Sequence, residues 1–146
     1  MATKGMDRLL KELAGLGKRA LNQKVAWKVV GGMVFRRFAV EWFRCALGLR
    51  KSGGGPRDNP WRALTSEPYI KRKLKKRKTK KLVYTGTLRT SYFFEAANDH
   101  CIVGNRDFEK AGWLEKMGFE VLALENDISN KTEEIITNYI WTGKRR

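Results

Sequence analysis

The residues most able to do chemistry in this chain are the lysines and arginines between positions 71 and 81. On a helix these charges point to nearly all sides, so we expect the helix to be exposed along its length. Like charges four residues apart also destabilise a helix. We therefore expect an anionic partner, either DNA phosphates or acidic residues of a neighbouring subunit, with a merely solvated basic face as the alternative. The basic residues are Lys71, Arg72, Lys73, Lys75, Lys76, Arg77, Lys78, Lys80 and Lys81.

Residues that could support catalysis are few. The single histidine, His100, precedes Cys101, but adjacent residues of a strand point to opposite faces, so we expect a turn or strand-end histidine and no Cys/His site. The acidic pair Glu133 and Glu134 is expected near a helix start, where the macrodipole favours carboxylates. The run Gly53–Gly55 lacks the Lys-Ser/Thr of a phosphate-binding loop. We therefore expect no enzyme activity, no cofactor and no metal.

Aromatic residues allow two further interpretations. Tyr84, Tyr92, Phe93 and Phe94 follow the basic run and could stack on bases, although alternation along a strand would expose only some of them. Residues 25–50 could lie on a membrane as an interfacial helix. In both cases packing in a core is the simpler expectation. The chain contains no run of eighteen apolar residues, so we expect no membrane-spanning segment and no membrane partner.

The charge is unevenly distributed along the 146 residues. The net charge of +16 comes from a strongly basic segment, 1–81, with 23 basic and 5 acidic side chains, while 82–142 has 5 basic and 10 acidic. Such a chain suits head-to-tail contacts between copies, which close into rings when the rotation permits. Cys45 and Cys101 lack metal-site spacing, and we expect both to be reduced core thiols.

Hydrophobic periodicity and turn residues predict an α+β fold in a single domain, 1–146. We expect N-terminal helices in 1–51, a Gly/Pro loop at 52–60, a basic central helix, a small antiparallel β-sheet and a C-terminal helix. The expected helices are 6–21, 22–50 with a bend or split at Gly31 and Gly32, 66–81, 107–117 ended by Gly118, and one capped by Ser129 or Asn130. The expected strands are 82–84, 90–97, 101–103 and 119–124.

A known family shares part of this order. Over residues 55–105 a tryptophan follows a Gly/Pro loop, a lysine lies in the next helix, and a Thr-Gly-x-Leu sequence leads to a hairpin ending at Val103-Gly104. The residues concerned are Trp61, Lys73, Thr85, Gly86 and Leu88. This arrangement resembles the phage virion-morphogenesis or tail-completion family. In that family pattern Gly86 would form a turn with positive φ.

The resemblance implies a structural virion protein at the head-tail interface, in the tail or neck, assembled in the cytoplasm of the host bacterium. It implies a six- or twelve-membered ring that contacts portal, head-completion or adaptor proteins and tail terminator or tube proteins. We expect the basic helix to face the DNA path, with non-specific contact to packaged DNA. Tail completion, tail termination and neck roles stay open, and the alternative is a small basic nucleic-acid-binding protein that grips phosphate backbones.

Overall fold

Helix α2 (Lys24–Arg36) is the central element of the computed structural model, which describes residues 2–46, 48–78 and 87–144. The fold is α+β with N-terminal helices, one antiparallel hairpin and a C-terminal helix, as predicted. The other elements are α1 (Ala2–Leu21), the π-helix η1 (Arg37–Glu41), α3 (Trp42–Arg44), α4 (Glu67–Lys75), α5 (Thr87–Thr90), β1 (Tyr92–Ala96), β2 (Cys101–Asn105), α6 (Phe108–Lys116) and α7 (Asn126–Thr142).

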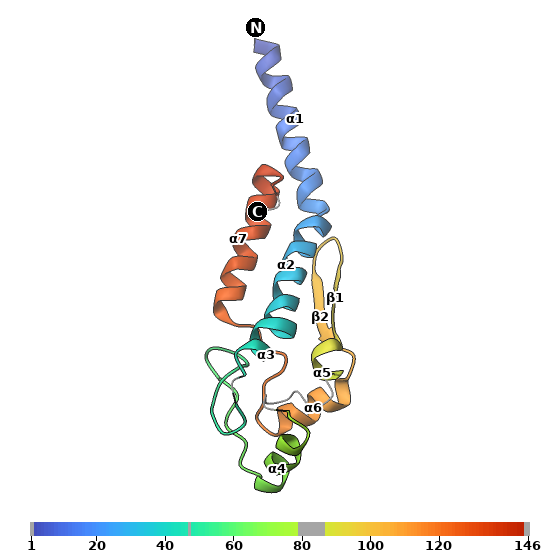
Figure 1. Ribbon diagram of the computed structural model, residues 1–146. Coiled ribbons are helices and arrows are strands. Elements are labelled where there is room, and N and C mark those ends of the chain that lie inside the picture. The colour runs from blue at the N-terminus through green and yellow to red at the C-terminus, as the bar shows by residue number, and fades with distance from the viewer. Residues whose placement is uncertain (1, 47, 79–86, 145–146) are drawn as a thin grey trace.

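The elements form an elongated molecule (Figure 1). Helix α1 extends beyond the body at one end, and α4 lies at the opposite end. The hairpin packs on one side of α2 and α7 on another. Helix α1 meets the body through the C-terminal part of α7, where the Arg19 Nε donates a hydrogen bond of 2.7 Å to the carbonyl of Ile140. The N-terminal half of α1 is therefore far from α4.

Helix α2 continues through Gly31 and Gly32, so the predicted bend or split at these residues is wrong. A Cβ added to Gly31 would lie 2.5 Å from Cδ2 of Phe94, whereas one on Gly32 would lie 4.0 Å from that ring. Gly31 thus serves close packing of the hairpin against the helix. The change in helical geometry comes later, at η1, where the chain shifts to a π-helical turn.

The predicted hairpin is confirmed. Strands β1 and β2 pair antiparallel, with Tyr92 opposite Asn105 and Phe94 opposite Val103. Tyr92 faces the core and is 5% exposed. Its hydroxyl donates a hydrogen bond of 2.7 Å to the carbonyl of Val121, and burial raises the Tyr92 pKa above its ordinary value. The strand predicted at 82–84 lies outside the described residues.

The strand predicted at 119–124 is wrong, because this segment is irregular. Its apolar residues Phe119 and Val121 are buried in the core, which accounts for the apolar pattern. Two of its carbonyls accept hydrogen bonds from side chains instead of a neighbouring strand: Glu120 from the Trp61 indole at 2.7 Å, and Val121 from Tyr92. Side-chain donors can satisfy buried backbone carbonyls as a sheet would.

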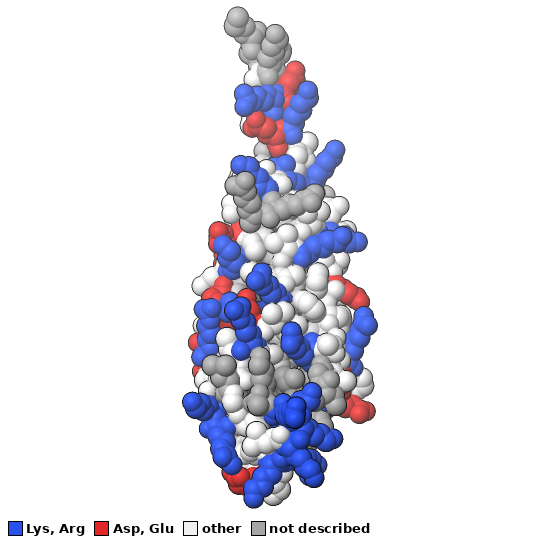
Figure 2. Space-filling model, viewed as in Figure 1, with Lys and Arg blue, Asp and Glu red and all other residues white. Residues whose placement is uncertain are grey.

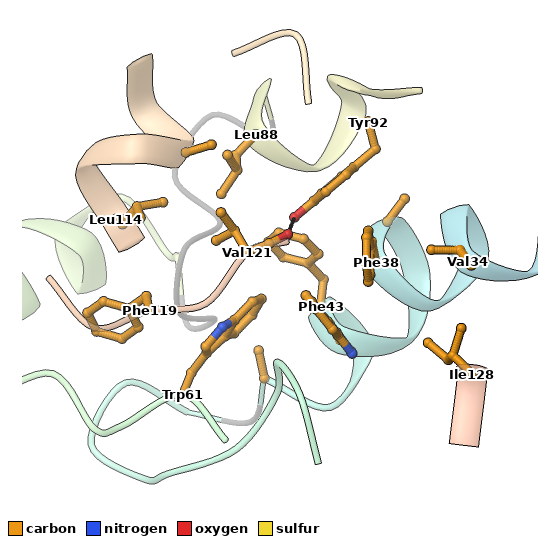
Figure 3. Packing of buried hydrophobic residues seen from close by; sticks show 14 of the residues in the cluster. Val34, Phe38, Phe43, Trp61, Leu88, Tyr92, Leu114, Phe119, Val121 and Ile128 are labelled. Atoms are coloured by element: carbon orange, nitrogen blue, oxygen red, sulfur yellow. Dashed lines mark hydrogen bonds between the residues drawn. The ribbon is translucent and has the colours of Figure 1, made fainter. Parts of the chain in front are cut away.

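An aromatic cluster forms the centre of the core (Figure 3). The Phe43 and Trp61 rings have centroids 5.1 Å apart, and those of Phe38 and Trp42 are 4.5 Å apart. The Gly/Pro loop holds Trp61 in place through two backbone hydrogen bonds, from Gly53 to Trp61 and from Trp61 to Gly54. Because residues of 25–50 supply so much of this core, the core-helix interpretation of that segment is confirmed.

The last two helices were predicted with different success. Helix α6 spans Phe108–Lys116, close to the predicted 107–117, and Gly118 has a positive φ of 82° just beyond its end. Helix α7 begins at Asn126, earlier than the predicted caps. The buried carboxylate of Glu125, the residue before α7, lies 3.6 Å from the Arg37 guanidinium and accepts a hydrogen bond of 2.7 Å from the Arg57 amide. These contacts, made by residues distant in sequence, tie the start of α7 to η1 and the loop.

Candidate polyanion-binding site

Helix α4 begins at Glu67, within one residue of the predicted start at 66, with Ser66 preceding its first residue and Pro68 in its first turn. Glu67 in the same turn pairs with Arg50 at 2.9 Å. Ile70 is buried at 1% exposure and faces Leu49 across a hollow at this end of the molecule. The Ile70 side chain therefore anchors the helix to the body on one face.

The predicted C-terminal end of this helix is wrong, since α4 stops at Lys75 and not near Lys81. The amide of Lys78 bonds to the carbonyl of Lys73 at 2.9 Å, and that of Arg77 to Leu74 at 2.8 Å. With Arg77 at a φ of 55°, this is a Schellman motif that has arginine where glycine is usual. Lys80, Lys81 and the motif residues Thr85 and Gly86 lie outside the described residues.

Lys73 corrects the expectation that the basic helix is exposed all round. Its side chain is 0% exposed, and its Nζ lies 5.7 Å from the centre of the Tyr69 ring. Burial, with a smaller effect of Lys78, lowers the pKa of Lys73 to about 8. The helix thus has one buried amine among surface cations, and the pattern of charges in the sequence does not distinguish it from its neighbours.

The remaining described cations of the run form a single exposed surface, which we call the basic cap. Its residues are Lys71, Arg72, Lys75, Lys76, Arg77 and Lys78. Lys71 and Lys75, and likewise Arg72 and Lys76, are four residues apart on the helical turn and repel each other. Figure 2 shows this end of the molecule densely covered by basic side chains. The basic cap can bind phosphates or carboxylates through charge-assisted hydrogen bonds.

Two exposed aromatic residues, one of them on α4, share a hollow that the sequence interpretation missed. Tyr69 and Trp113, at 36% and 60% exposure, line a hollow of about 280 Å³ together with Arg62 and Met117. Of the rings considered for stacking, Tyr92 is buried in the core, as expected, and Tyr84 lies outside the described residues. The position of Tyr69 within the basic helix was the only sequence signal for this hollow.

The histidine and cysteines considered for catalysis do not come together in a catalytic arrangement. His100 is exposed at the hairpin turn, with its Nδ1 2.6 Å from the Asp99 carboxylate. Cys101 is half-buried, and burial raises the pKa of its thiol. Cys45 is exposed, so the expectation of a core thiol is wrong for it. Within the described ranges, no group of three or more His, Cys, Asp or Glu residues could hold a metal ion.

The described residues of the family motif are all buried. Trp61 and Leu88 belong to the main hydrophobic cluster, at 1% and 2% exposure, and Lys73 is fully buried in α4. Asn105, at the end of the hairpin, donates a hydrogen bond of 2.8 Å to the Leu88 carbonyl. The motif residues therefore position the loop, α4 and the hairpin, while the basic cap is made by the residues around Lys73.

Two further findings complete the description. No helix among residues 2–46, 48–78 and 87–144 combines the length and apolar character that a bilayer crossing needs. Compared with protein-family models, with curated proteins and with solved structures, the chain matches none of them.

Proposed function

We propose that this chain is a non-enzymatic assembly protein of a phage virion, located at the head-tail interface. Copies of it form a ring around the DNA path, between head-side proteins such as the portal and tail-side proteins such as the tube. The basic cap contacts a polyanion there, either packaged DNA or an acidic protein surface. The order of Trp61, Lys73 and Leu88 along the chain supports the resemblance to the tail-completion family. The basic cap supports a role beside a polyanion.

The observation that carries the proposal is the energetic cost of the basic cap to the isolated chain. Arg77 occupies the left-handed region, where a side chain with a Cβ costs about 1–2 kcal/mol relative to its ordinary conformation. The like-charged pair within α4, Lys71 and Lys75, costs about 0.2–0.5 kcal/mol more. A glycine at 77 and neutral residues on α4 would relieve both costs. An anionic partner gives a reason for cations at these positions.

The shape of the molecule also fits an assembly role. The basic cap lies at one end of the rod and α1, with its exposed apolar residues, at the other (Figures 1 and 2). A protein with separate contact surfaces at two ends can bridge neighbours in a stack. In contrast, His100, Cys101 and the acidic residues described above do not form the hydrogen-bonded set of nucleophile, base and orienting group that a catalytic site needs.

Genetic complementation with a matched charge control tests the proposal. A phage that lacks this gene is supplied with the triple variant Lys71→Gln, Arg72→Gln, Lys75→Gln, which neutralises the basic cap. The control neutralises three exposed lysines elsewhere, Lys18, Lys24 and Lys28, with the same change in net charge. We expect the wild type and the control to restore infectious particles and the cap variant to fail. Absence of the protein from purified infectious virions would refute the proposal.

The second candidate is a nucleic-acid-binding protein that acts outside a virion, and one observation favours it. Tyr69 of α4 and Trp113 line one hollow together with Arg62, and exposed rings beside cations are the arrangement used for single-stranded nucleic acids. Binding of single-stranded DNA that Tyr69→Ala and Trp113→Ala both weaken would support this candidate. Equal binding of duplex and single strands, unaffected by these substitutions, would favour contact through phosphates alone.

A further inference from the structure

Helix α1 exposes apolar side chains that no other part of the described chain covers. Met6, Leu9, Leu10 and Leu13 recur at spacings of three and four residues, so they share one face. Each is at least 50% exposed. The helix meets α7 only further along, near Arg19. A face of this kind on a projecting helix is typical of a helix that binds in a groove.

An apolar groove of about 640 Å³ lies on the body of the same molecule. Its floor is the α2 face that includes Val34, its walls are β2 at Val103 and α7 at Ile136, and Leu124 lies at its edge. Leu124 is 66% exposed, so the groove opens to the surface. Glu133 of α7 also lines it and places a carboxylate beside the apolar surface. The groove therefore combines an apolar floor with an acidic edge.

We propose that α1 of one copy occupies the groove of a second copy. Figure 1 shows α1 running away from the body of its own chain, so its N-terminal half cannot fold back into its own groove without breaking the helix. Charge favours the contact between copies: residues 2–13, the half of α1 that would enter the groove, carry three basic and two acidic side chains, while α7 carries one basic and three acidic. The net charges of these two elements are opposite in sign.

Pairing of two α1 helices with each other is the competing contact for the same face. It would bring together two elements of the same net positive charge. The apolar repeat also extends over about two heptads, fewer than the three to four that a stable coiled coil needs. A preformed groove gives α1 a larger apolar partner and an acidic edge. The groove is therefore the better match for this helix.

This contact is heterologous, because each copy offers one helix and one groove at different places. Repetition of such a contact closes into a ring when the rotation permits. The inference rests on the ring assembly of the proposed function and assigns its contact surfaces. The contact uses no residue of the basic cap, because no residue of α4 lines the groove and α1 lies at the other end of the rod.

Three full-length variants, each changing exposed positions, test the contact by sedimentation velocity over a range of concentrations. The helix variant is Leu9→Glu with Leu13→Glu, and the groove variant is Leu124→Lys. The matched control is Ile102→Lys, which alters a residue of β2 that is 52% exposed, between two groove residues but pointing to the other face. Far-ultraviolet circular dichroism verifies that each variant is folded.

We expect the wild type and the control to self-associate, and the helix variant to associate at least about a hundredfold more weakly, because two leucine contacts are lost. The groove variant should also be weakened. Mixed together, the helix variant and the groove variant should form a dimer that grows no further, because one helix and one groove remain intact between them. That result separates the proposed contact from α1 pairing.

Three outcomes would overturn the inference: a wild type that stays monomeric at all concentrations, a groove variant that assembles like the wild type, or a mixture of the two variants that forms no dimer. Each of these is distinct from failure of the proposed function, which is judged by the presence of the protein in infectious virions. A protein found in virions whose copies do not join through α1 and the groove would keep its function and lose this contact.

Discussion

Replacement of Arg77 by glycine should make the protein more stable and a weaker ligand for polyanions. Arg77 has a φ of 55° and is exposed, and its amide closes the Schellman motif by bonding to the Leu74 carbonyl at 2.8 Å. Glycine keeps that amide and adopts the same φ without a Cβ clash. The substitution therefore changes backbone strain and charge and leaves the hydrogen bonds in place.

The size of the effect follows from three terms. Relief of the left-handed conformation contributes about 1–2 kcal/mol of stability. Removal of one cation from a crowded basic surface adds about 0.2–0.5 kcal/mol. The greater freedom of glycine in the unfolded chain offsets about 0.5–1 kcal/mol. We expect a net gain of about 1 kcal/mol in the free energy of unfolding.

Urea unfolding followed by circular dichroism measures the gain in stability. Binding to a DNA duplex of arbitrary sequence, titrated with salt, measures the loss of a phosphate contact. If Arg77 contacts a phosphate, the slope of log affinity against log salt should decrease in magnitude by about 0.9 for Arg77→Gly. Lys75→Gln is the matched control, because it removes one cap charge at a position within α4 and should alter the slope by the same amount with little gain in stability.

Two results would refute this reasoning in different ways. A destabilised Arg77→Gly variant would show that the arginine makes contacts worth more than the strain of its backbone. An unchanged salt slope for both Arg77→Gly and Lys75→Gln would show that the basic cap does not meet phosphates. In that case an acidic protein surface would be the better candidate than DNA for the partner of the basic cap.

Four further substitutions test the packing of buried residues. Because the pKa of Lys73 is lowered to about 8, the folded state binds fewer protons than the unfolded state between about pH 8 and 10.5. The free energy of unfolding should therefore rise with pH over this range. Lys73→Met should remove this contribution, as measured by urea titrations at several pH values. Gly31→Ala should destabilise by about 1–3 kcal/mol through its clash with Phe94, whereas Gly32→Ala should be neutral or stabilising; equal effects in thermal unfolding would contradict this packing. Trp61→Phe should cost about 2–4 kcal/mol from lost volume and a lost buried hydrogen bond, and a change below 1 kcal/mol in the same assay would argue against the aromatic core.

Several elements could be predicted because their causes are local. Helix α6 ends where Gly118 supplies a positive φ, and the hairpin forms from two β-branched and aromatic runs joined by Asn98 and Asp99. Helix α4 starts after Ser66, with Pro68 in a permitted position. In each case nearby residues contain the signal, so no knowledge of distant contacts is required.

The errors have a common physical cause, which is contact between residues distant in sequence. The segment 119–124 has the apolar pattern of a strand, but its carbonyls bond to Trp61 and Tyr92 instead of another strand. Gly31 has the composition of a helix break, yet it is where Phe94 packs against an unbroken helix. Neither partner can be identified from the local sequence.

By itself the sequence determined the α+β class, the position of the hairpin, and the concentration of positive charge between residues 71 and 81. These depend on residue type and short spacing. Only the tertiary structure decided that Lys73 is buried while its neighbours form the basic cap, that α4 ends in a left-handed arginine, and that the basic cap and the exposed face of α1 lie at opposite ends of a rod. Burial and relative position depend on packing between segments that are distant in sequence. A local pattern of charged residues therefore does not indicate which charged side chain will face the core.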